Sequence, residues 1–164
     1  MSGSLGVILA GGLATRMGGG DKGLLPLGSS TLLSHVIDRL TPQVDGIALN
    51  ANGDGSRFAH LGFPVIADSI NGFAGPLAGV LAGLDWAAKQ GATSIVTAAV
   101  DTPFFPSDLA VRLHREGEGM AHPLVIAATP DPKRRTSRHP TFGLWPVALR
   151  EDLRAALLGG VRKV

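Results

Sequence analysis

Hydrophobic residues along the chain gather in short continuous runs that polar, glycine-rich segments separate. This pattern is typical of strands buried on both faces of a sheet. Runs of this kind occupy residues 5–10, 46–51, 63–68 and 93–101, and the last is the richest in β-branched residues. We therefore predict four buried strands, with the strand at 93–101 in the middle of the sheet.

Between these runs, apolar residues recur at helical spacing. One stripe predicts a helix that Ser29 or Ser30 caps, and a second predicts a helix over residues 75–91. Shorter stripes predict a helix from about Ser107 and a last helix over roughly 147–158. The stripe residues of the first two helices are Leu33, Val36, Ile37 and Leu40, then Leu77, Val80, Leu81, Leu84 and Ala88.

The second half of the chain carries two further apolar runs, at 123–128 and 141–145, which we interpret as strands separated by a polar loop at 129–138. Strands that alternate with helices predict βαβ units and a mostly parallel sheet. A chain of 164 residues is most simply one domain, over residues 1–164.

Composition narrows the function classes. The chain has no cysteine, and no run reaches the roughly 18 apolar residues of a membrane span. The N-terminal apolar run is short and lacks the basic residues of a signal peptide, so we expect a cytoplasmic protein without a membrane partner. A net charge of +2 and few aromatic residues (Phe 6, Trp 2, Tyr 0) argue against nucleic-acid binding.

Polar residues follow each predicted parallel strand: "AGG" the first, "NAN" the second, "AD" the third and "VDTP" the central one. Ligands of open α/β sheets bind beyond the carboxyl ends of the strands, so this edge is the predicted ligand site. The glycine-rich loop after the first strand lets a ligand approach the main chain, and Arg16 and Lys22 suit a phosphate group. A solvated turn is the alternative. The loop matches neither GxxxxGK[ST] nor GxGxxG, which disfavours P-loop and hydride-transferring Rossmann enzymes.

The loop and five later segments carry a specific resemblance. "LAGGLATRMGGGDKGLLPLGSSTLL" at 9–33 resembles the signature of nucleotidyltransferases, and its doubled glycine and DK pair are most similar to the molybdenum cofactor guanylyltransferases. The later matches keep their order along the chain; they are "NAN" at 50–52, "DS" at 68–69, "GPLAG" at 75–79, "DTPFFPSDL" at 101–109 and "HPTFGLW" at 139–145. The resemblance implies a single Rossmann-like α/β nucleotidyltransferase domain, with a mainly parallel sheet flanked by helices. It also implies nucleotide binding by about 1–101 and acceptor binding by the remainder.

The resemblance further implies a reaction: transfer of GMP from GTP to the phosphate of molybdopterin, with release of pyrophosphate. Mg²⁺, which Mn²⁺ can replace, and cationic side chains would neutralise the triphosphate. By resemblance Arg16 and Lys22 bind the triphosphate and Asp101 is the metal ligand, these three being the catalytic set. The remaining expected substrate-binding residues are Leu9, Ala10, Gly11, Gly12, Asn50, Asp68 and Gly75.

The residues themselves leave alternatives open. Asn50 and Asp68 could only satisfy loop amides, and Asp101 could only cap a turn. Arg138 and His139 resemble the pterin-side segment of the family, although a histidine beside a proline is more often a turn residue. Other proteins of cofactor synthesis, or recipient enzymes, are further candidate partners. Relatives are expected to continue beyond "GGVRKV" with a tail that this sequence lacks.

Guanine is not distinguishable from cytosine by side chains alone. A transferase that uses CTP or a sugar-phosphate acceptor, and a non-catalytic nucleotide-binding accessory protein, are therefore the competing hypotheses.

Overall fold

The computed structural model describes residues 4–10, 26–27, 30–52, 58, 62–70, 76–100, 102, 104–133 and 135–159. A six-stranded sheet has the order β5-β4-β1-β6-β8-β7. Its strands are β1 (Ser4–Leu9), β4 (Ile47–Asn50), β5 (Val65–Ile66), β6 (Ser94–Ala99), β7 (Val125–Asp131) and β8 (Arg135–Pro146). Strands β5, β4, β1 and β6 are parallel, whereas β8 and β7 are each antiparallel to their neighbour. The predicted mainly parallel sheet, with 93–101 near its middle, is confirmed.

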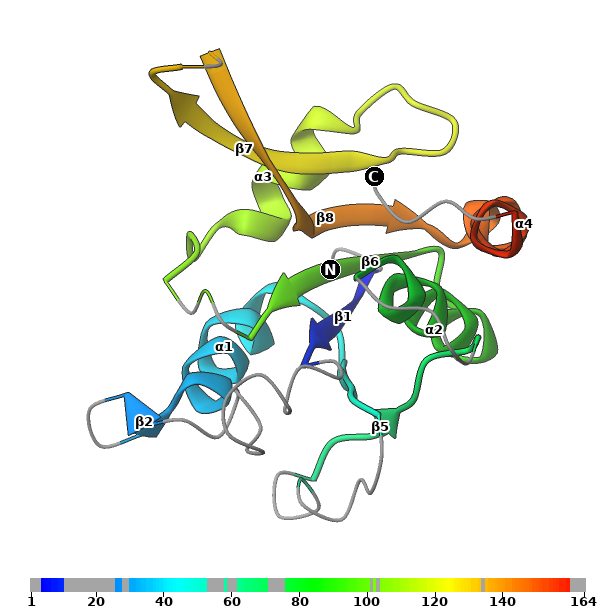
Figure 1. The fold of residues 1–164 in the computed structure, drawn as a ribbon, viewed down its shortest axis with the longest axis horizontal. Helices are drawn as coiled ribbons and strands as arrows, with labels where there is room; N and C mark the ends of the chain where they lie inside the picture. Colours follow the sequence, from blue (N-terminus) through cyan, green and yellow to red (C-terminus); the bar gives the residue numbers. More distant parts are fainter. Residues whose placement is uncertain are drawn as a thin grey trace.

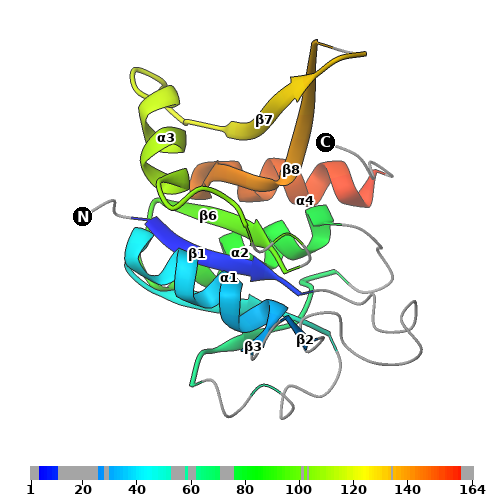
Figure 2. The same ribbon diagram turned by 90° about the vertical axis from the view of Figure 1, so that its left-hand side faces the viewer.

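Helices cover both faces of the sheet (Figures 1 and 2). Helices α1 (Leu32–Leu40) and α3 (Leu109–Glu116) pack on one face, and α2 (Pro76–Lys89) and α4 (Arg150–Leu158) pack on the other. Successive residues of β1 serve opposite faces: Val7 belongs to the α2 side of the core and Ile8 to the α1 side. Because both faces are buried, the strands consist of continuous apolar runs.

The start of α1 differs from the prediction. The N-cap is Thr31, whose Oγ1 accepts a 3.1 Å hydrogen bond from the Ser34 amide, and not Ser29 or Ser30. Ser30 is still extended there, because Pro26–Leu27 (β2) and Ser30–Thr31 (β3) form a small antiparallel sheet. The helix can therefore begin only after Thr31.

Helix α2 is buried almost all round, and its end is set by a glycine. Gly91 has φ +77°, which favours glycine, and its amide donates to the Ala88 carbonyl. The Ala92 amide donates to the Ala87 carbonyl at 3.0 Å, so the two bonds form a Schellman motif. The predicted buried face included Ala88, but the fully buried residue is Ala87. The difference arises because α2 contacts both the sheet and α4.

Helix α3 begins at Leu109, two residues beyond the predicted start. A side chain from another element sets this boundary: Gln43, at the end of the 3₁₀ turn η3 (Thr41–Gln43), accepts a 2.8 Å bond from the Ala110 amide. Before the last helix, a second 3₁₀ turn, η5 (Val147–Leu149), precedes α4. The last helix, predicted over roughly 147–158, is thus confirmed, with its first turn formed by the 3₁₀ turn η5 and the rest by α4.

The polar segment 129–138 is not a loop, which corrects the prediction. β7 and β8 pair from Ala127↔His139 to Asp131↔Arg135, so they form a ribbon with a short turn at its tip. The Lys133 amide donates to the Asp131 carboxylate at 2.7 Å in this turn. Figures 1 and 2 show the β7–β8 ribbon extending away from the helical layers. Ala128, Thr129 and Pro130 of β7 are all exposed, so the alternation that marks a half-buried strand is missing there.

Buried polar groups meet at the amino ends of β1 and β6. Ser4 Oγ lies 2.5 Å from Ser94 Oγ and 2.8 Å from His114 Nε2, which comes from α3. Burial lowers the pKa of His114 below its usual 6.5, because the charged ring would lose hydration. His114 therefore acts as a neutral hydrogen-bonding partner that ties α3 to the sheet.

None of the described helices is long and apolar enough to cross a membrane.

This arrangement predicts a pH-dependent stability. The unfolded chain binds a proton at His114 more readily than the folded chain does, so stability falls as the pH drops below about 6.5 and is constant above it. Replacing His114 with Gln keeps a hydrogen-bonding amide but removes the titration. Between pH 7.5 and 5.5 we expect the melting temperature of the wild type to fall by about 2 °C more than that of His114→Gln. The exposed His122→Gln serves as control, and equal pH slopes for all three proteins would contradict the expectation.

Candidate active site

The carboxyl ends of β1, β4 and β6 meet through backbone hydrogen bonds. The Ala10 amide donates to the Asn50 carbonyl at 2.9 Å, and the Val100 amide donates to the Leu9 carbonyl at 3.4 Å. The predicted binding residues Leu9, Ala10 and Asn50 thus lie at one edge of the sheet, as expected for parallel strands.

A hydrogen-bond network fixes Asp68 beside this edge. Asn50 Nδ2 donates to Asp68 Oδ1 and Asn52 Nδ2 donates to Asp68 Oδ2, both at 3.0 Å. The Asp68 amide donates back to Asn52 Oδ1 at 2.9 Å. Asn50 is buried and Asp68 half-buried, so the carboxylate is held in one orientation with part of its surface open to a ligand. The "NAN" and "AD" strand ends therefore form one unit, in which Asn52 has a role that the sequence did not assign.

Helix α2 presses on this network from behind. A Cβ on Gly79 would collide with Asn50 Oδ1 and lie 3.0 Å from Leu9 Cδ2, so only glycine allows the helix to pack this closely on the Asn50 carboxamide. This contact gives the predicted "GPLAG" segment a physical role, because its last glycine leaves space for the site.

The other predicted site residues cannot be placed. Arg16, Lys22, Gly11, Gly12, Gly75 and Asp101 lie outside the described residues. Val100 and Thr102, which flank the predicted metal ligand in sequence, follow the carboxyl end of β6. Within the part of the chain that the structure describes, no three His, Asp or Glu side chains gather into a group that could hold a metal ion.

A groove lies between α3 and the β7–β8 ribbon and reaches Thr102, the residue after the predicted metal ligand. It has a volume of about 930 Å³. Phe105 and Phe142 are buried in its floor, whereas Phe104 on its wall is 69% exposed and packs against His35 at a ring separation of 6.3 Å. We call this hollow the α3 groove.

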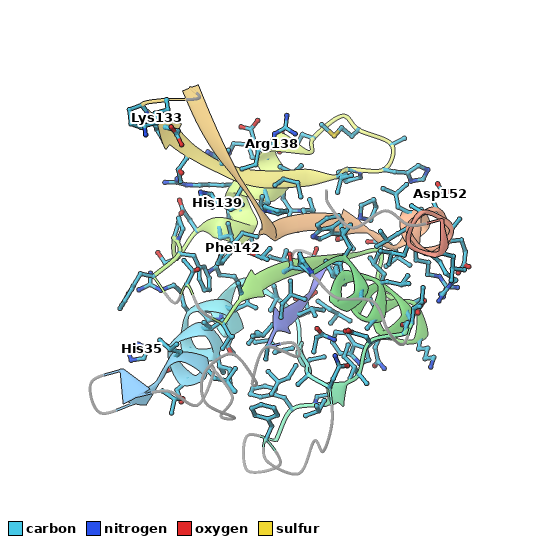
Figure 3. The ribbon with its side chains drawn as sticks, viewed as in Figure 1. His35, Lys133, Arg138, His139, Phe142 and Asp152 are labelled. Atoms are coloured by element: carbon cyan, nitrogen blue, oxygen red, sulfur yellow. The ribbon has the colours of Figure 1, made fainter. Side chains whose placement is uncertain are left out.

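Cationic residues also line the α3 groove. Arg112 and Arg115 of α3 do so, and Arg112 pairs with Asp108 at 2.9 Å. His139 of β8 lies on the opposite wall, where its Nε2 is 2.8 Å from Thr129 Oγ1, and Figure 3 shows it between Phe142 and Arg138. His139 thus lines the groove, while the exposed Arg138 does not. Phe104 lies within the "DTPFFPSDL" segment but was not singled out as a site residue, and Arg112 lies outside every quoted motif.

Comparison with known proteins gives the family. The model of the MobA-like NTP transferase domain matches residues 6–164. The chain is 53% identical over 161 residues to a molybdenum cofactor guanylyltransferase of Rhodopseudomonas palustris, covering 96% of this chain and 74% of that relative. It is 51% identical to the protein of the same name from Nitrobacter hamburgensis, covering 97% and 75%. The chain belongs to the molybdenum cofactor guanylyltransferase family.

Solved structures agree on the fold of this nucleotidyltransferase. Molybdopterin-guanine dinucleotide biosynthesis protein A from Archaeoglobus fulgidus superimposes with a TM-score of 0.71 at 24% identity, over 97% of this chain and 75% of that one. A 4-diphosphocytidyl-2C-methyl-D-erythritol synthase from Anaerococcus prevotii gives a TM-score of 0.75 at 16% identity, over 99% and 78%. These neighbours confirm the predicted α/β fold, whereas the family model and the sequence relatives confirm the family resemblance of the ordered motifs.

The contact between Gly79 and Asn50 predicts a coupled stability effect. Gly79→Ala should destabilise the protein by about 2 kcal/mol, because the added methyl displaces a buried, hydrogen-bonded carboxamide. In an Asn50→Ala background the same substitution should cost less than half as much, since the colliding oxygen is gone. Denaturant unfolding of the four proteins gives the coupling free energy.

Gly83→Ala is the matched control for this cycle. Gly83 lies one turn further along α2, where its added methyl would meet Val7 Cγ2 at 2.8 Å and not Asn50. Its cost should be the same in both backgrounds. Equal costs of Gly79→Ala in the two backgrounds would show that Asn50 does not limit the approach of α2.

Proposed function

We propose that this chain transfers GMP from GTP to the terminal phosphate of molybdopterin, releasing pyrophosphate and forming a guanine dinucleotide cofactor. The 53% identity to a molybdenum cofactor guanylyltransferase over 96% of the chain carries this proposal. The acceptor is itself an anion, so the reaction needs charge neutralisation and alignment more than a general base. Since both substrates are soluble small molecules of the cell interior, we place the enzyme in the cytoplasm.

In this proposal the edge formed by β1, β4 and β6 receives the nucleotide. Leu9 and Ala10, with Gly11, Gly12 and Gly75, would offer main-chain groups to it. Asn50 and Asp68 support this reading because their side chains are already fixed by hydrogen bonds, and fixed groups bind without a further loss of conformational entropy. Each Asp68 oxygen accepts one amide proton and retains a lone pair, so the carboxylate suits N–H or O–H donors of a nucleotide.

Arg16, Lys22 and Asp101 would handle the triphosphate. Arg16 and Lys22 would stabilise the charge that develops on the leaving pyrophosphate. Mg²⁺ favours one or two carboxylates together with phosphate oxygens, and Asp101, two residues after β6 in sequence, would provide the carboxylate. Asp68, each of whose oxygens accepts one amide proton, would contact the nucleotide and not the metal. When bound, Mg²⁺ neutralises triphosphate charge.

The α3 groove supports acceptor binding by the second part of the chain, after about residue 101. Its exposed Phe104 offers a ring face to a planar heterocycle, and Arg112 and Arg115 offer charge to a phosphate. Thr102 lies in the wall of the groove, next in sequence to the proposed metal ligand. An acceptor bound there would have its phosphate near the nucleotide edge. Proteins that supply molybdopterin, or enzymes that receive the dinucleotide, are the proposed partners.

Removing the proposed metal carboxylate should abolish most of the activity. With GTP, Mg²⁺ and molybdopterin, we expect Asp101→Asn to lower pyrophosphate release at least about a hundredfold, because charge compensation in the transition state is lost. Its melting temperature should stay within about 2 °C of the wild type. Asp152→Asn, an exposed carboxylate on α4, is the control and should retain full activity.

The wild-type assay also separates the competing functions. Faster turnover with CTP than with GTP would replace the guanylyl assignment with a cytidylyl one. Turnover with a sugar phosphate in place of molybdopterin would change the acceptor. Nucleotide binding without pyrophosphate release would indicate an accessory protein, and full activity of Asp101→Asn would remove the metal role.

The proposed acceptor site makes a separate prediction. Phe104→Ala should raise the KM for molybdopterin about fivefold, since stacking on an aromatic face contributes on the order of 1 kcal/mol. The affinity for GTP should stay within about twofold, because Phe104 lies in the α3 groove and not at the nucleotide edge. Met120→Ala also removes an exposed apolar side chain, outside the groove, and should change neither quantity. An unchanged molybdopterin KM in Phe104→Ala would place the acceptor elsewhere.

A further inference from the structure

Ser69, the residue after Asp68, anchors this segment to helix α2. Ser69 Oγ donates a 2.6 Å hydrogen bond to Oδ2 of Asp85, which lies on α2. Strand β5, which precedes this segment, contains only Val65 and Ile66, so few backbone bonds hold the chain here. The amides of Asn50 and Asn52 fix Asp68 on the β4 side, and Asp85 fixes the next residue on the α2 side.

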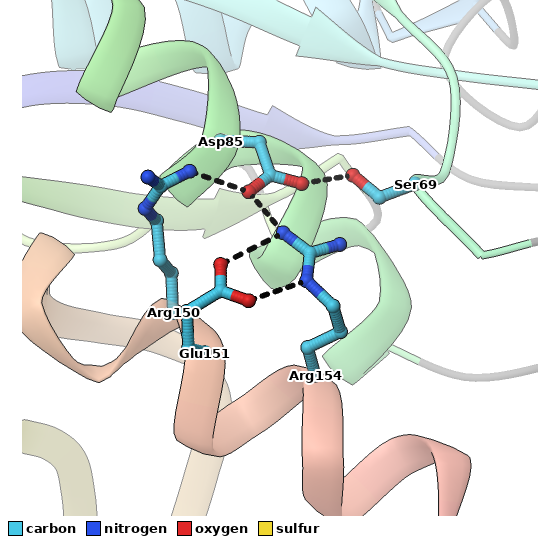
Figure 4. Close-up of polar contacts among 5 residues, drawn as sticks. All are labelled: Ser69, Asp85, Arg150, Glu151 and Arg154. Carbon is cyan, nitrogen blue, oxygen red and sulfur yellow. Dashed lines mark hydrogen bonds and ion pairs between the residues drawn. The ribbon is translucent and has the colours of Figure 1, made fainter.

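Asp85 is held in turn by two arginines from the last helix (Figure 4). Arg154 Nη2 lies 2.6 Å and Arg150 Nη1 lies 3.2 Å from Asp85 Oδ1, and the Asp85 side chain is 20% exposed. Asp85 Oδ1 thus accepts hydrogen bonds from the two arginines, while Oδ2 accepts the hydrogen bond from Ser69. Glu151 occupies the outer side of Arg154, with its Oε1 3.0 Å from Arg154 Nε.

The charge of Asp85 is stabilised in this setting. Burial alone would raise its pKa, but the hydrogen bonds from Ser69 and Arg154, the charge of Arg154 and the bond from Arg150 together lower it below 3.8. Asp85 is therefore an anion throughout the neutral range. A charged acceptor makes a stronger hydrogen bond to the Ser69 hydroxyl than a neutral one would.

We propose that Asp85 is a positioning residue for nucleotide binding: it clamps Ser69, holds Asp68 of the nucleotide edge in its binding orientation, and is itself oriented by Arg150 and Arg154 of α4. This inference rests on the proposed function, because it takes Asp68 as a nucleotide ligand. It adds a role for the last described helix, which contributes to the nucleotide half of the site without touching it.

Three variants separate positioning from stability. Ser69→Ala removes only the hydroxyl that joins the Asp68 segment to Asp85. Ser69→Thr keeps a hydroxyl and is the conservative rescue, since Ser69 is exposed and has room for a methyl group. Glu151→Gln weakens the outer ion pair of Arg154 while leaving the bonds to Asp85 in place, and it is the matched control within the same cluster.

The main readout is the dissociation constant for GTP by calorimetry, with the steady-state KM and kcat beside it. Ser69→Ala should weaken GTP binding and raise KM for GTP about five- to tenfold, with kcat within about twofold, since loss of one charge-assisted hydrogen bond is large enough for this change. Asp85→Asn should produce a similar increase in KM. Ser69→Thr and Glu151→Gln should stay within about twofold of the wild type, and the melting temperature of Ser69→Ala should be close to that of the wild type.

The outcomes keep the two proposals apart. Wild-type GTP affinity in Ser69→Ala overturns the positioning role whatever the enzyme catalyses. If Glu151→Gln weakens GTP binding as much as Ser69→Ala does, the positioning role is overturned as well. The effect would then be a general loss of α4 packing. A wild-type protein that binds GTP but releases no pyrophosphate contradicts the proposed function. In that case the ratio of the GTP dissociation constants of Ser69→Ala and the wild type still decides the role of Asp85.

Discussion

Strand β1 is hydrogen-bonded on both sides by parallel neighbours, and helices cover both of its faces. Its side chains are consequently apolar from Val7 to Leu9, and polar groups of the nucleotide half can gather only where the strands end. Parallel pairing also sets the carboxyl ends of β4 and β5 side by side, next to that of β1, so residues 50 and 68 meet although 18 positions separate them. The position of the candidate site follows from this constraint and requires no catalytic residue to be known.

Much of the fold could be predicted because burial leaves a strong signature. The stripe of α1 and three of the four continuous apolar runs correspond to buried elements, whereas the run at 63–68 forms only the two half-buried residues of β5, Val65 and Ile66. The ribbon at 129–138 was missed for the opposite reason: backbone pairing holds its strands, and Ala128, Thr129 and Pro130 of β7 are all exposed, so they show no alternation. The start of α1 was missed because Ser30 and Thr31 pair with Pro26 and Leu27, which leaves Thr31 as the N-cap. The start of α3 was missed because Gln43 acts through a tertiary contact, which a local pattern does not contain.

The candidate site divides in the same way. Its location and the pairing of Asn50 with Asp68 follow from strand ends, and the family was predicted from ordered motifs that the comparisons confirm. Asn52, Ser69 and Asp85 were not predicted as part of the site, because their roles depend on which side chains face one another after folding. The aromatic wall of the α3 groove likewise combines residues from separate elements. Side chains that support a ligand-binding residue have no signature of their own in one sequence.

The reversed direction of β8 has a consequence for how the molecule is put together. Because β8 runs against β6, with Thr97 opposite Gly143, the residues that precede Gly143 continue past the carboxyl end of β6. A single change of strand direction therefore delivers His139 and Phe142 to the edge where the parallel strands end, where a parallel strand would have needed another crossover helix. The tip of the hairpin is not paired with β6, so insertions or deletions there can reshape the proposed acceptor site while the proposed nucleotide edge remains undisturbed.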